Sequence, residues 1–280
     1  MSEITKALAV RAIGVMMASL AFCAASGTAS GATLAEIKAR GYIVVATEDD
    51  YPPFEFVKDG KPTGYDNELI EELRKYAPFQ VRHEILPFTG ILAGVATGKY
   101  DIAITAAVMT KERMQSLDFA SPIADASDYY LYKTSDTSIK SLNDLSGKTV
   151  GVQAGSAQLA HLSQLKSTLE KSGGKMGKIV EYTSYPEAYQ DLALGRTEYV
   201  VNTIINLRAL VNEKPKVFAM GKQVSATSVA AWPVKKGNTE LLEYINGFIA
   251  SQKASGKISA LQKKWFGQSF DLPVKFVPEY

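Results

Sequence analysis

Short apolar runs with strand character alternate along this chain with segments of helical hydrophobic spacing. In the first half the strand-like runs are 42–46, 81–86 and 101–105, and the helical segments are 67–76 and 91–97. Leu69, Ile70 and Leu73 share one face of the first helical segment, and Gly98 ends the second as a C-cap signal. This alternation predicts βαβ units, and therefore an α/β fold with mainly parallel sheets.

The second half shows the same pattern in a separate unit. Strand-like runs cover 148–152, 179–182 and 198–202, helical segments cover 158–171 and 186–194, and two further helical segments lie within 239–266. No repeat of fixed period and no Pro- or Ser-rich linker separates the two halves. We therefore expect two α/β units joined by short crossovers, with a cleft between them that is the default place for a ligand.

The composition excludes several classes of function. The chain has 280 residues, and its hydrophobic fraction of 46% is too high for a disordered protein. A net charge of +2 gives no field that would attract nucleic acid. One Cys and two His exclude a Cys/His zinc cluster, and neither His83 nor His161 stands in a catalytic motif. We expect no metal, no cofactor, no catalytic residue and no nucleic-acid partner.

Residues 1–30 have the features of a secretory signal peptide. Two basic residues precede an apolar run at 12–25, and small residues follow it. The run is shorter than the about 20 residues of a membrane-spanning helix, which is the alternative interpretation. Bulky Phe22 before Cys23 argues against a lipoprotein signal. Cleavage near Ser30 would leave a mature chain without cysteine, which suits an oxidising compartment outside the cytoplasm.

The segment Thr110-Lys-Glu-Arg113 follows a strand-like run and opens a stretch with helical character. Thr110 is a good N-cap, but the third residue after it is Arg113, where a capping box would have an acid. A cation there opposes the helix dipole unless it points away to hold an anion that also meets the helix N-terminus. The alternative is a surface arginine paired with a nearby acid, which the spacing alone favours.

Two further segments carry candidate ligand contacts. The turn Gly155-Ser156 lies between a strand and a helix, where it offers either a second anion contact or an ordinary capped turn. Tyr51 and Phe88 follow strand-like runs, and they either flank an organic ligand or pack in the core. Glu48 either pairs with an ammonium group or is solvated. We expect structural roles for other residues of these loops: Phe54, Phe56 and Asp49 as core or solvated side chains, and Asp66 as a helix N-cap.

The ordered set of these motifs resembles a known family. The set comprises Tyr51-Pro-Pro-Phe54, Gly60-Lys-Pro-Thr-Gly64-Tyr-Asp66, Gly98-Lys-Tyr-Asp101, Thr110-Lys-Glu-Arg113, Leu145-Ser-Gly-Lys148-Thr-Val-Gly-Val152, Gly155-Ser156, Gly195-Arg196 and Trp265-Phe-Gly267. It is similar to the periplasmic solute-binding proteins of amino-acid ABC transporters, family 3, the polar amino-acid group. The resemblance extends over essentially the whole mature chain.

The resemblance implies a two-lobed, type II periplasmic-binding-protein fold that closes on one ligand like a Venus flytrap. Lobe 1 would comprise residues 31–127 and 229–280, and lobe 2 residues 128–228. Two crossover strands near 128–132 and 224–229 would form the hinge.

The resemblance also implies roles for individual residues. Arg113 would hold the ligand carboxylate, and Glu48 would contact the ammonium or the side chain. The other implied contacts are Tyr51 and Phe88 against the ligand faces, Thr105 and Ala106 along the pocket, and Ser156 and Ala157 from lobe 2. Where the family usually has an aspartate for the α-ammonium, this chain has Asn202 and Thr203, and Val108 replaces a usual Ser or Thr. These departures leave open whether the ligand carries a free α-ammonium group.

The function implied is that of an import receptor in the periplasm. It would bind an amino acid or related small carboxylate and deliver it to a membrane permease, as a monomer and without catalysis. One alternative is an enzyme on the same scaffold, similar to the periplasmic dehydratases of prephenate or arogenate, which would need an acid such as Glu48 in the cleft. Another is a sensory protein that presents its ligand to a receptor.

Overall fold

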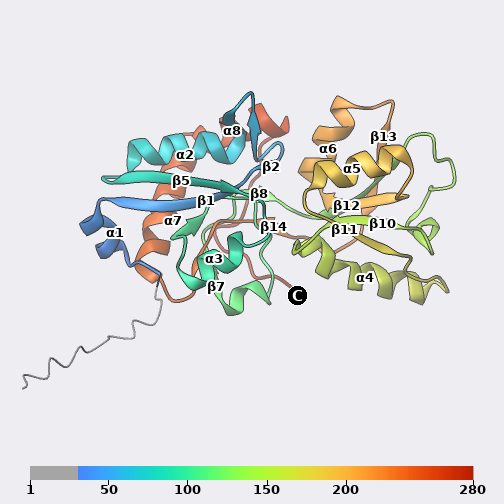
Figure 1. Cartoon of the computed structure of the whole chain (residues 1–280), viewed down its shortest axis with the longest axis horizontal. Coiled ribbons are helices and arrows are strands. Elements are labelled where there is room, and N and C mark those ends of the chain that lie inside the picture. Colours follow the sequence, from blue (N-terminus) through green and yellow to red (C-terminus); the bar gives the residue numbers. More distant parts are fainter. Residues whose placement is uncertain (1–30, 280) are drawn as a thin grey trace, which may run out of the picture.

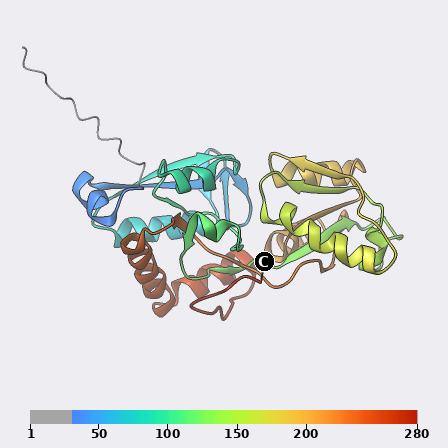
Figure 2. The ribbon, with the colours of Figure 1, turned by 90° about the horizontal axis from the view of Figure 1, so that it is seen from below.

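The computed structural model describes residues 31–279, so the signal-peptide prediction for residues 1–30 lies outside the described residues. Two five-stranded mixed sheets form two lobes that lie side by side along the long axis (Figure 1). The view from below shows the same two bodies, with the chain passing between them near the middle (Figure 2). None of the helices in residues 31–279 is both long and apolar enough to cross a membrane.

The first sheet has the strand order β5-β1-β6-β15-β7. Its strands are β1 (Tyr42–Glu48), β5 (Gln80–Leu86), β6 (Ile102–Ala103), β7 (Leu117–Phe119) and β15 (Pro233–Lys235), and its helices are α1 (Leu34–Arg40), α2 (Tyr65–Tyr76), α3 (Ile91–Thr97), α7 (Thr239–Ala254) and α8 (Lys257–Phe266). β1 pairs parallel with β5 and β6, whereas β15 runs antiparallel to β6 and β7. Alternate residues of β1 face opposite sides: Val45 joins the core that contains α2, and Ala46 packs with α3.

The second sheet has the order β11-β10-β12-β9-β13. Its strands are β9 (Asp128–Lys133), β10 (Val150–Gln153), β11 (Ile179–Tyr182), β12 (Tyr199–Thr203) and β13 (Phe218–Gln223), and its helices are α4 (Ala157–Lys171), α5 (Tyr185–Leu194) and α6 (Ile204–Glu213). β10 pairs parallel with β11 and β12, whereas β9 is antiparallel to β12 and β13. In each sheet four strands therefore run in the same direction, and only one, β15 or β9, runs antiparallel to its two neighbours, so the prediction of mainly parallel sheets is confirmed.

Two small sheets complete the fold. β2 (Asp50–Tyr51), β3 (Glu55–Lys58) and β4 (Lys61–Thr63) form an antiparallel sheet that follows β1 directly. β8 (Ala124–Asp125) pairs antiparallel with β14 (Val229–Ala230) where the chain leaves one lobe and returns to it. The sequence predicted this crossing near 128–132 and 224–229. The first of these ranges was wrong, because β9 is a full strand of the second sheet and the chain crosses just before it.

Most predicted elements occur within two residues of their expected bounds, and α3 and β11 have the bounds predicted for them. Two local predictions were wrong. The stretch after Thr110 forms only a single 3₁₀ turn, Arg113–Gln115, rather than a longer helix. Asp66 does not cap α2, whose N-cap is Gly64; its carboxylate instead accepts a hydrogen bond of 3.1 Å from Trp232 Nε1 in the core.

The second lobe packs without space at Gly221 in β13. A Cβ atom built there would lie 1.9 Å from Cζ of the Tyr130 ring. Tyr130 is almost fully buried and pairs through its strand with β12, so its ring has little room to withdraw. Overpacking of this kind costs about 1–3 kcal/mol.

We therefore expect Gly221→Ala to lower the thermal midpoint by several degrees, since about 1 kcal/mol corresponds to roughly 2–4 °C at this chain length. Gly247→Ala in α7 is the matched control, because the nearest atom to its Cβ, Tyr76 Oη, is 3.5 Å away and alanine favours a helix interior. Calorimetry should show a lower midpoint for the first variant and an equal or higher one for the second. Equal losses would contradict the packing argument.

Candidate functional site

A cavity of about 10 Å³ lies between the lobes, and charged and polar side chains from both lobes line it. It is lined by Glu48, Tyr51, Phe88, Thr105, Ala106, Ala107, Val108, Arg113, Gln153, Ser156, Ala157 and Gln158. Eight of the ten residues predicted as ligand contacts are among these; Asn202 and Thr203 are not. A solute larger than a water molecule can enter only if the lobes separate.

The first lobe supplies its part of the wall from the ends of neighbouring strands. Glu48 is the last residue of β1, and Phe88 follows β5. The segment 105–108 follows β6. Because the carboxyl ends of parallel strands meet at one edge of a sheet, residues far apart in sequence converge there. The turn after β1 adds Tyr51, which is stacked against Phe54 with ring centroids 5.9 Å apart.

Arg113 reaches across the cleft from the loop after this wall. Its Nη1 donates to the carbonyl of Val108 at 2.9 Å, and its Nη2 donates to the carbonyl of Gly155, in the second lobe, at 3.1 Å. Its Cζ lies 5.7 Å from the centroid of the Phe88 ring. Within residues 31–279 no carboxylate lies at ion-pair distance from Arg113. The alternative of a surface arginine paired with a nearby acid is therefore not supported. Burial lowers its pKa to about 10, so the guanidinium stays charged at neutral pH.

The loop that holds Arg113 has the cap geometry expected of Thr110. The Thr110 hydroxyl accepts a hydrogen bond of 3.1 Å from the backbone N–H of Arg113. The helix that this cap would start does not continue, and the short turn leaves the arginine side chain free to point into the cleft.

The second lobe faces the cavity with the turn into α4. Gly155 has φ +71°, a conformation that favours glycine, and its carbonyl is the one that Arg113 contacts. Ser156 is the N-cap of α4, and its hydroxyl accepts from Leu159 N–H at 3.1 Å. The first turn of a helix leaves backbone N–H groups without intrahelical partners, and these suit an anion.

Among residues 31–279, Glu48 is the only acid that lines the cavity. It is 2% exposed, and its Oε1 accepts a hydrogen bond from Gln153 Nε2 in the second lobe. Burial, opposed by the hydrogen bond from Gln153 and assisted by the nearby acids Asp49 and Asp50, raises its pKa to about 8. With the lobes closed, this carboxyl group therefore tends to hold a proton at neutral pH, and a cation beside it would favour the ionised form.

Asn202 and Thr203 lie behind the cavity rather than along it. Asn202 Oδ1 accepts from Tyr51 Oη at 2.9 Å and from the N–H of Thr203 at 2.7 Å, and its Nδ2 donates to Tyr189 Oη at 2.7 Å. Both the oxygen and the nitrogen of its amide therefore have partners within the protein. Asn202 thus fixes the hydroxyl of Tyr51 across the cleft.

The sequence interpretation missed Gln153 and Gln158. Gln153 ends β10, two residues before the Gly155-Ser156 turn that the sequence singled out, so its position at a strand end was the available signal. Gln158 gives no such signal, because its orientation depends on a buried acid of another element. Its Nε2 donates to Asp128 Oδ1 at 2.8 Å, while Ser225 Oγ donates to Asp128 Oδ2 at 2.8 Å.

The same carboxylate also lies 2.6 Å from His161 Nδ1. Asp128 opens β9 just after the crossing, and Ser225 lies on the returning crossing, so this network fixes α4 to both connections between the lobes. His161 therefore has the structural role expected of it. His83 is also partly buried, with its Nε2 2.7 Å from Thr47 Oγ1.

Two buried acids stand behind the first-lobe wall. The Thr105 hydroxyl donates to Glu55 Oε1, which holds this cavity residue from behind. Burial raises the pKa of Glu55 well above its ordinary value, and Asp66 and Glu48 add to the shift. Burial also raises the pKa of Asp66, to about 7. In residues 31–279 no group of three or more His, Cys, Asp or Glu side chains is arranged to hold a metal ion.

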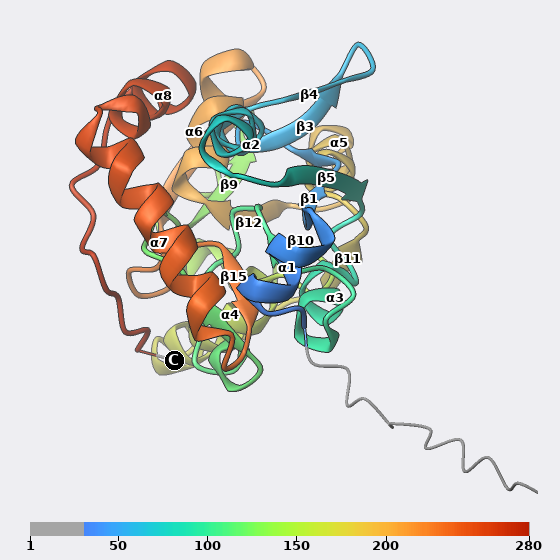
Figure 3. The ribbon, with the colours of Figure 1, turned by 90° about the vertical axis from the view of Figure 1, so that its left-hand side faces the viewer.

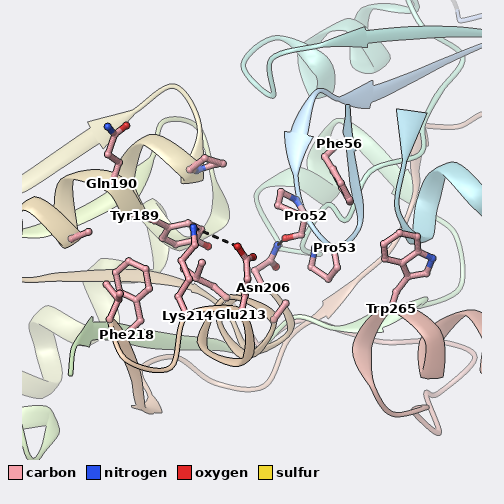
Figure 4. Close-up of a pocket in the computed structure, with 15 residues that line it drawn as sticks. Pro52, Pro53, Phe56, Tyr189, Gln190, Asn206, Glu213, Lys214, Phe218 and Trp265 are labelled. Carbon is pink, nitrogen blue, oxygen red and sulfur yellow. Dashed lines mark hydrogen bonds and ion pairs between the residues drawn. The ribbon is translucent and has the colours of Figure 1, made fainter. Parts of the chain in front are cut away.

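A larger groove of about 630 Å³ lies between the lobes on another side (Figure 4). Pro53, Phe56 and Trp265 of the first lobe face Tyr189 and Phe218 of the second across it. Its charged members, Glu213 and Lys214, are 3.6 Å apart and pair with each other. The groove is therefore mainly apolar, whereas the small cavity offers a charged group for each end of a zwitterion, and we assign the candidate ligand site to the cavity.

The chain forms two α/β lobes joined by two connections, β8 and β14, which pair with each other, and charged groups converge between the lobes. These features define a two-lobed solute-binding protein. Residues 43–268 match the bacterial extracellular solute-binding proteins, family 3, and the chain belongs to this family. It is a binding protein of ABC import rather than an enzyme.

Similar proteins agree with this assignment. The L-cystine-binding protein TcyJ of Escherichia coli (strain K12) is 29% identical over 258 residues, which is 91% of this chain and 94% of the relative. The putative amino-acid ABC transporter-binding protein PatH of Vibrio harveyi is 29% identical over 237 residues, which is 83% of this chain and 92% of the relative. The crystal structure of the ancestral amino acid-binding protein AncCDT-1, a precursor of cyclohexadienyl dehydratase, matches with a TM-score of 0.72 and 30% identity. The match covers 83% of this chain and 98% of that protein's chain.

The raised pKa of Glu48 predicts a pH dependence of stability. The native state holds a proton that the unfolded chain releases above its ordinary pKa of about 4.3, so this contribution to stability is complete at low pH and is lost as pH rises toward 8. Thermal midpoints measured at pH 5 and pH 8 should therefore fall less in Glu48→Gln than in the wild type. Asp59→Asn, at an exposed position in the β3–β4 turn and not among the acids that act on Glu48, is the matched control and should keep the wild-type difference; identical differences in all three proteins would contradict the burial of Glu48.

Proposed function

We propose that this protein is the extracytoplasmic receptor of an amino-acid importer and that it binds an α-amino acid as a zwitterion between its lobes. The observation that carries the proposal is the placement of Arg113 and Glu48, of opposite charge, on one cavity that both lobes line. A carboxylate can pair with the guanidinium in a bidentate, charge-assisted manner, and an ammonium group can pair with the carboxylate of Glu48.

The position of Glu48 explains how the chain can bind an amino acid although Asn202 replaces the usual acid. A buried ammonium needs a counter-charge, since an unpaired one costs several kcal/mol. Glu48 is the acid on the cavity, and an ammonium beside it would also reverse the shift that burial imposes on its pKa. The ligand would then displace Gln153 from Glu48 and the Gly155 carbonyl from Arg113.

The remaining wall is uncharged, which indicates the class of side chain. Gln153, Ser156 and Gln158 offer amide and hydroxyl groups, and Tyr51 and Phe88 offer aromatic faces. A second net charge on the ligand would find no partner there. We therefore propose an amino acid without net side-chain charge, a class that includes glutamine and cystine; the name of the relative TcyJ, an L-cystine-binding protein, supports it.

Closure couples binding to delivery. The closed form touches the ligand from both lobes and the open form from one, so the ligand shifts the population toward closure. We propose lobe 1 as residues 31–127 and 229–280 and lobe 2 as residues 128–228, with the β8–β14 pair as the hinge. A signal peptide at 1–30 would direct the chain to the periplasm. Because one chain supplies both sides of the cleft, we propose that it acts as a monomer.

Replacement of Arg113 should abolish ligand binding and leave the fold intact. Each charge-assisted hydrogen bond contributes about 1.5–3 kcal/mol, so the loss of a bidentate pair weakens binding by at least about 100-fold. The test is calorimetric titration of Arg113→Ala with L-glutamine and L-cystine, after unfolding and refolding to remove carried ligand. Lys38→Ala, at an exposed position of α1 outside the cavity, is the control and should bind as the wild type does; undiminished affinity in Arg113→Ala would overturn its assignment.

The ligand class has its own test. The wild type should bind L-glutamine or L-cystine at least about ten-fold more tightly than L-arginine or L-glutamate, because the charged side chains lack a partner. Glu48→Gln should lose these amino acids but keep any affinity for glutarate, which has no ammonium group. If the wild type binds glutarate and no amino acid, the ligand class is that of carboxylates without an ammonium, and the role given to Glu48 fails.

A further inference from the structure

The last residues of the chain form a tail that lies beyond the family match, which ends at residue 268. After α8 the chain has no helix or strand up to residue 279. The tail runs from the end of α8 down the left-hand side of the view along the long axis (Figure 3). Seen from below, it passes under the first lobe toward the junction of the two lobes (Figure 2).

One face of the tail packs on the crossing between the lobes. Leu272 and Phe276 contact a small apolar cluster that contains Met109, Val229 and Ala231. Pro278 is buried, and the backbone carbonyl of Glu279 accepts a hydrogen bond of 2.7 Å from Lys111 Nζ. The opposite face is open to solvent, since Val274 is 72% and Val277 79% exposed. The contacts are therefore one-sided, as in a segment that covers a surface.

The cluster under the tail is connected directly to the ligand cavity. The N–H of Met109 donates to the carbonyl of Val229 in β14 at 3.0 Å, and Val108 forms a bridge with Ala230. The carbonyl of Val108 in turn accepts from Arg113 Nη1 at 2.9 Å. The tail thus covers Met109, whose neighbour Val108 supplies the carbonyl that accepts a hydrogen bond from the Arg113 guanidinium.

We propose that the tail is a strap that holds the Arg113 loop on the hinge strand β14, with Phe276 as its positioning residue. The proposal rests on the proposed function, in which Arg113 binds the ligand carboxylate. Phe276 and Leu272 exclude water from the hydrogen bond between Met109 and Val229, and Lys111 fastens the tail end two residues from Arg113. The strap thereby keeps the guanidinium in its binding orientation before the ligand arrives. Ligand binding then does not have to supply the free energy of ordering this loop.

A purely stabilising tail would predict a different result. It would raise the thermal midpoint without a local effect on residues 107–114. The strap predicts local loosening of that segment, with weaker ligand binding, when its inner face is removed. The solvent-facing valines of the same tail provide the matched control, because their side chains contribute little packing.

The experiment compares Phe276→Ala, Phe276→Leu and the double variant V274A/V277A in the full chain. Hydrogen exchange in the absence of ligand should be faster by about ten-fold in peptides covering 107–114 of Phe276→Ala and unchanged in peptides of α4. Affinity for L-glutamine and L-cystine should fall about ten-fold, Phe276→Leu should restore most of both properties, and V274A/V277A should match the wild type.

Unchanged exchange at 107–114 in Phe276→Ala would overturn the strap, whether or not the thermal midpoint falls. Faster exchange with undiminished affinity would overturn the role in positioning Arg113. If the wild type binds neither amino acid, the proposed function fails, and the exchange measurement still decides whether the tail restrains the loop.

Discussion

The rest of the site depends on a half-buried guanidinium between the two lobes, against which no carboxylate of residues 31–279 lies. Arg113 donates to one backbone carbonyl of each lobe, Val108 and Gly155, and these neutral partners only partly replace water. A partly desolvated cation is costly unless a charge compensates it, so an anionic group of a ligand would be favoured beside it. Because one of the two carbonyls belongs to the second lobe, the orientation of this side chain and the closure of the lobes are coupled.

The second charge of the site lies on the same lobe as the first. Asn202 leaves the second lobe without an acid toward the cavity, and its amide is used to hold Tyr51 instead. Glu48 stands at the end of β1, so both ends of a zwitterion would dock on the first lobe, and the second would close with amides and a helix N-terminus. In the proposed complex, the first lobe would bind both charged groups of the ligand, and the second lobe would contact the ligand only on closure.

Local sequence signals predicted the ends of helices well where the chain has its own capping residues. Left-handed glycines such as Gly98 and Gly195 end their helices as expected. Predictions failed where tertiary contacts override local preference: the Thr110 cap starts only one 3₁₀ turn, and Asp66 turns from capping α2 to Trp232. For the site, the motif residues at strand ends converge on one cavity. The sequence did not predict Gln158 as a cavity residue, because its side chain is oriented by Asp128, 30 residues away.

The sequence by itself determined the α/β class, the two-lobed family and the residue types that meet in the cleft, because periodicity, caps and ordered motifs are local properties. The tertiary structure alone decided which candidates share a surface: Asn202 is withdrawn behind Tyr51, Gln153 faces Glu48, and the tail packs on Met109, next to the Val108 carbonyl that Arg113 contacts. These pairings join residues that lie far apart along the chain. Their energies depend on desolvation and distance, which exist only once the lobes have folded and met.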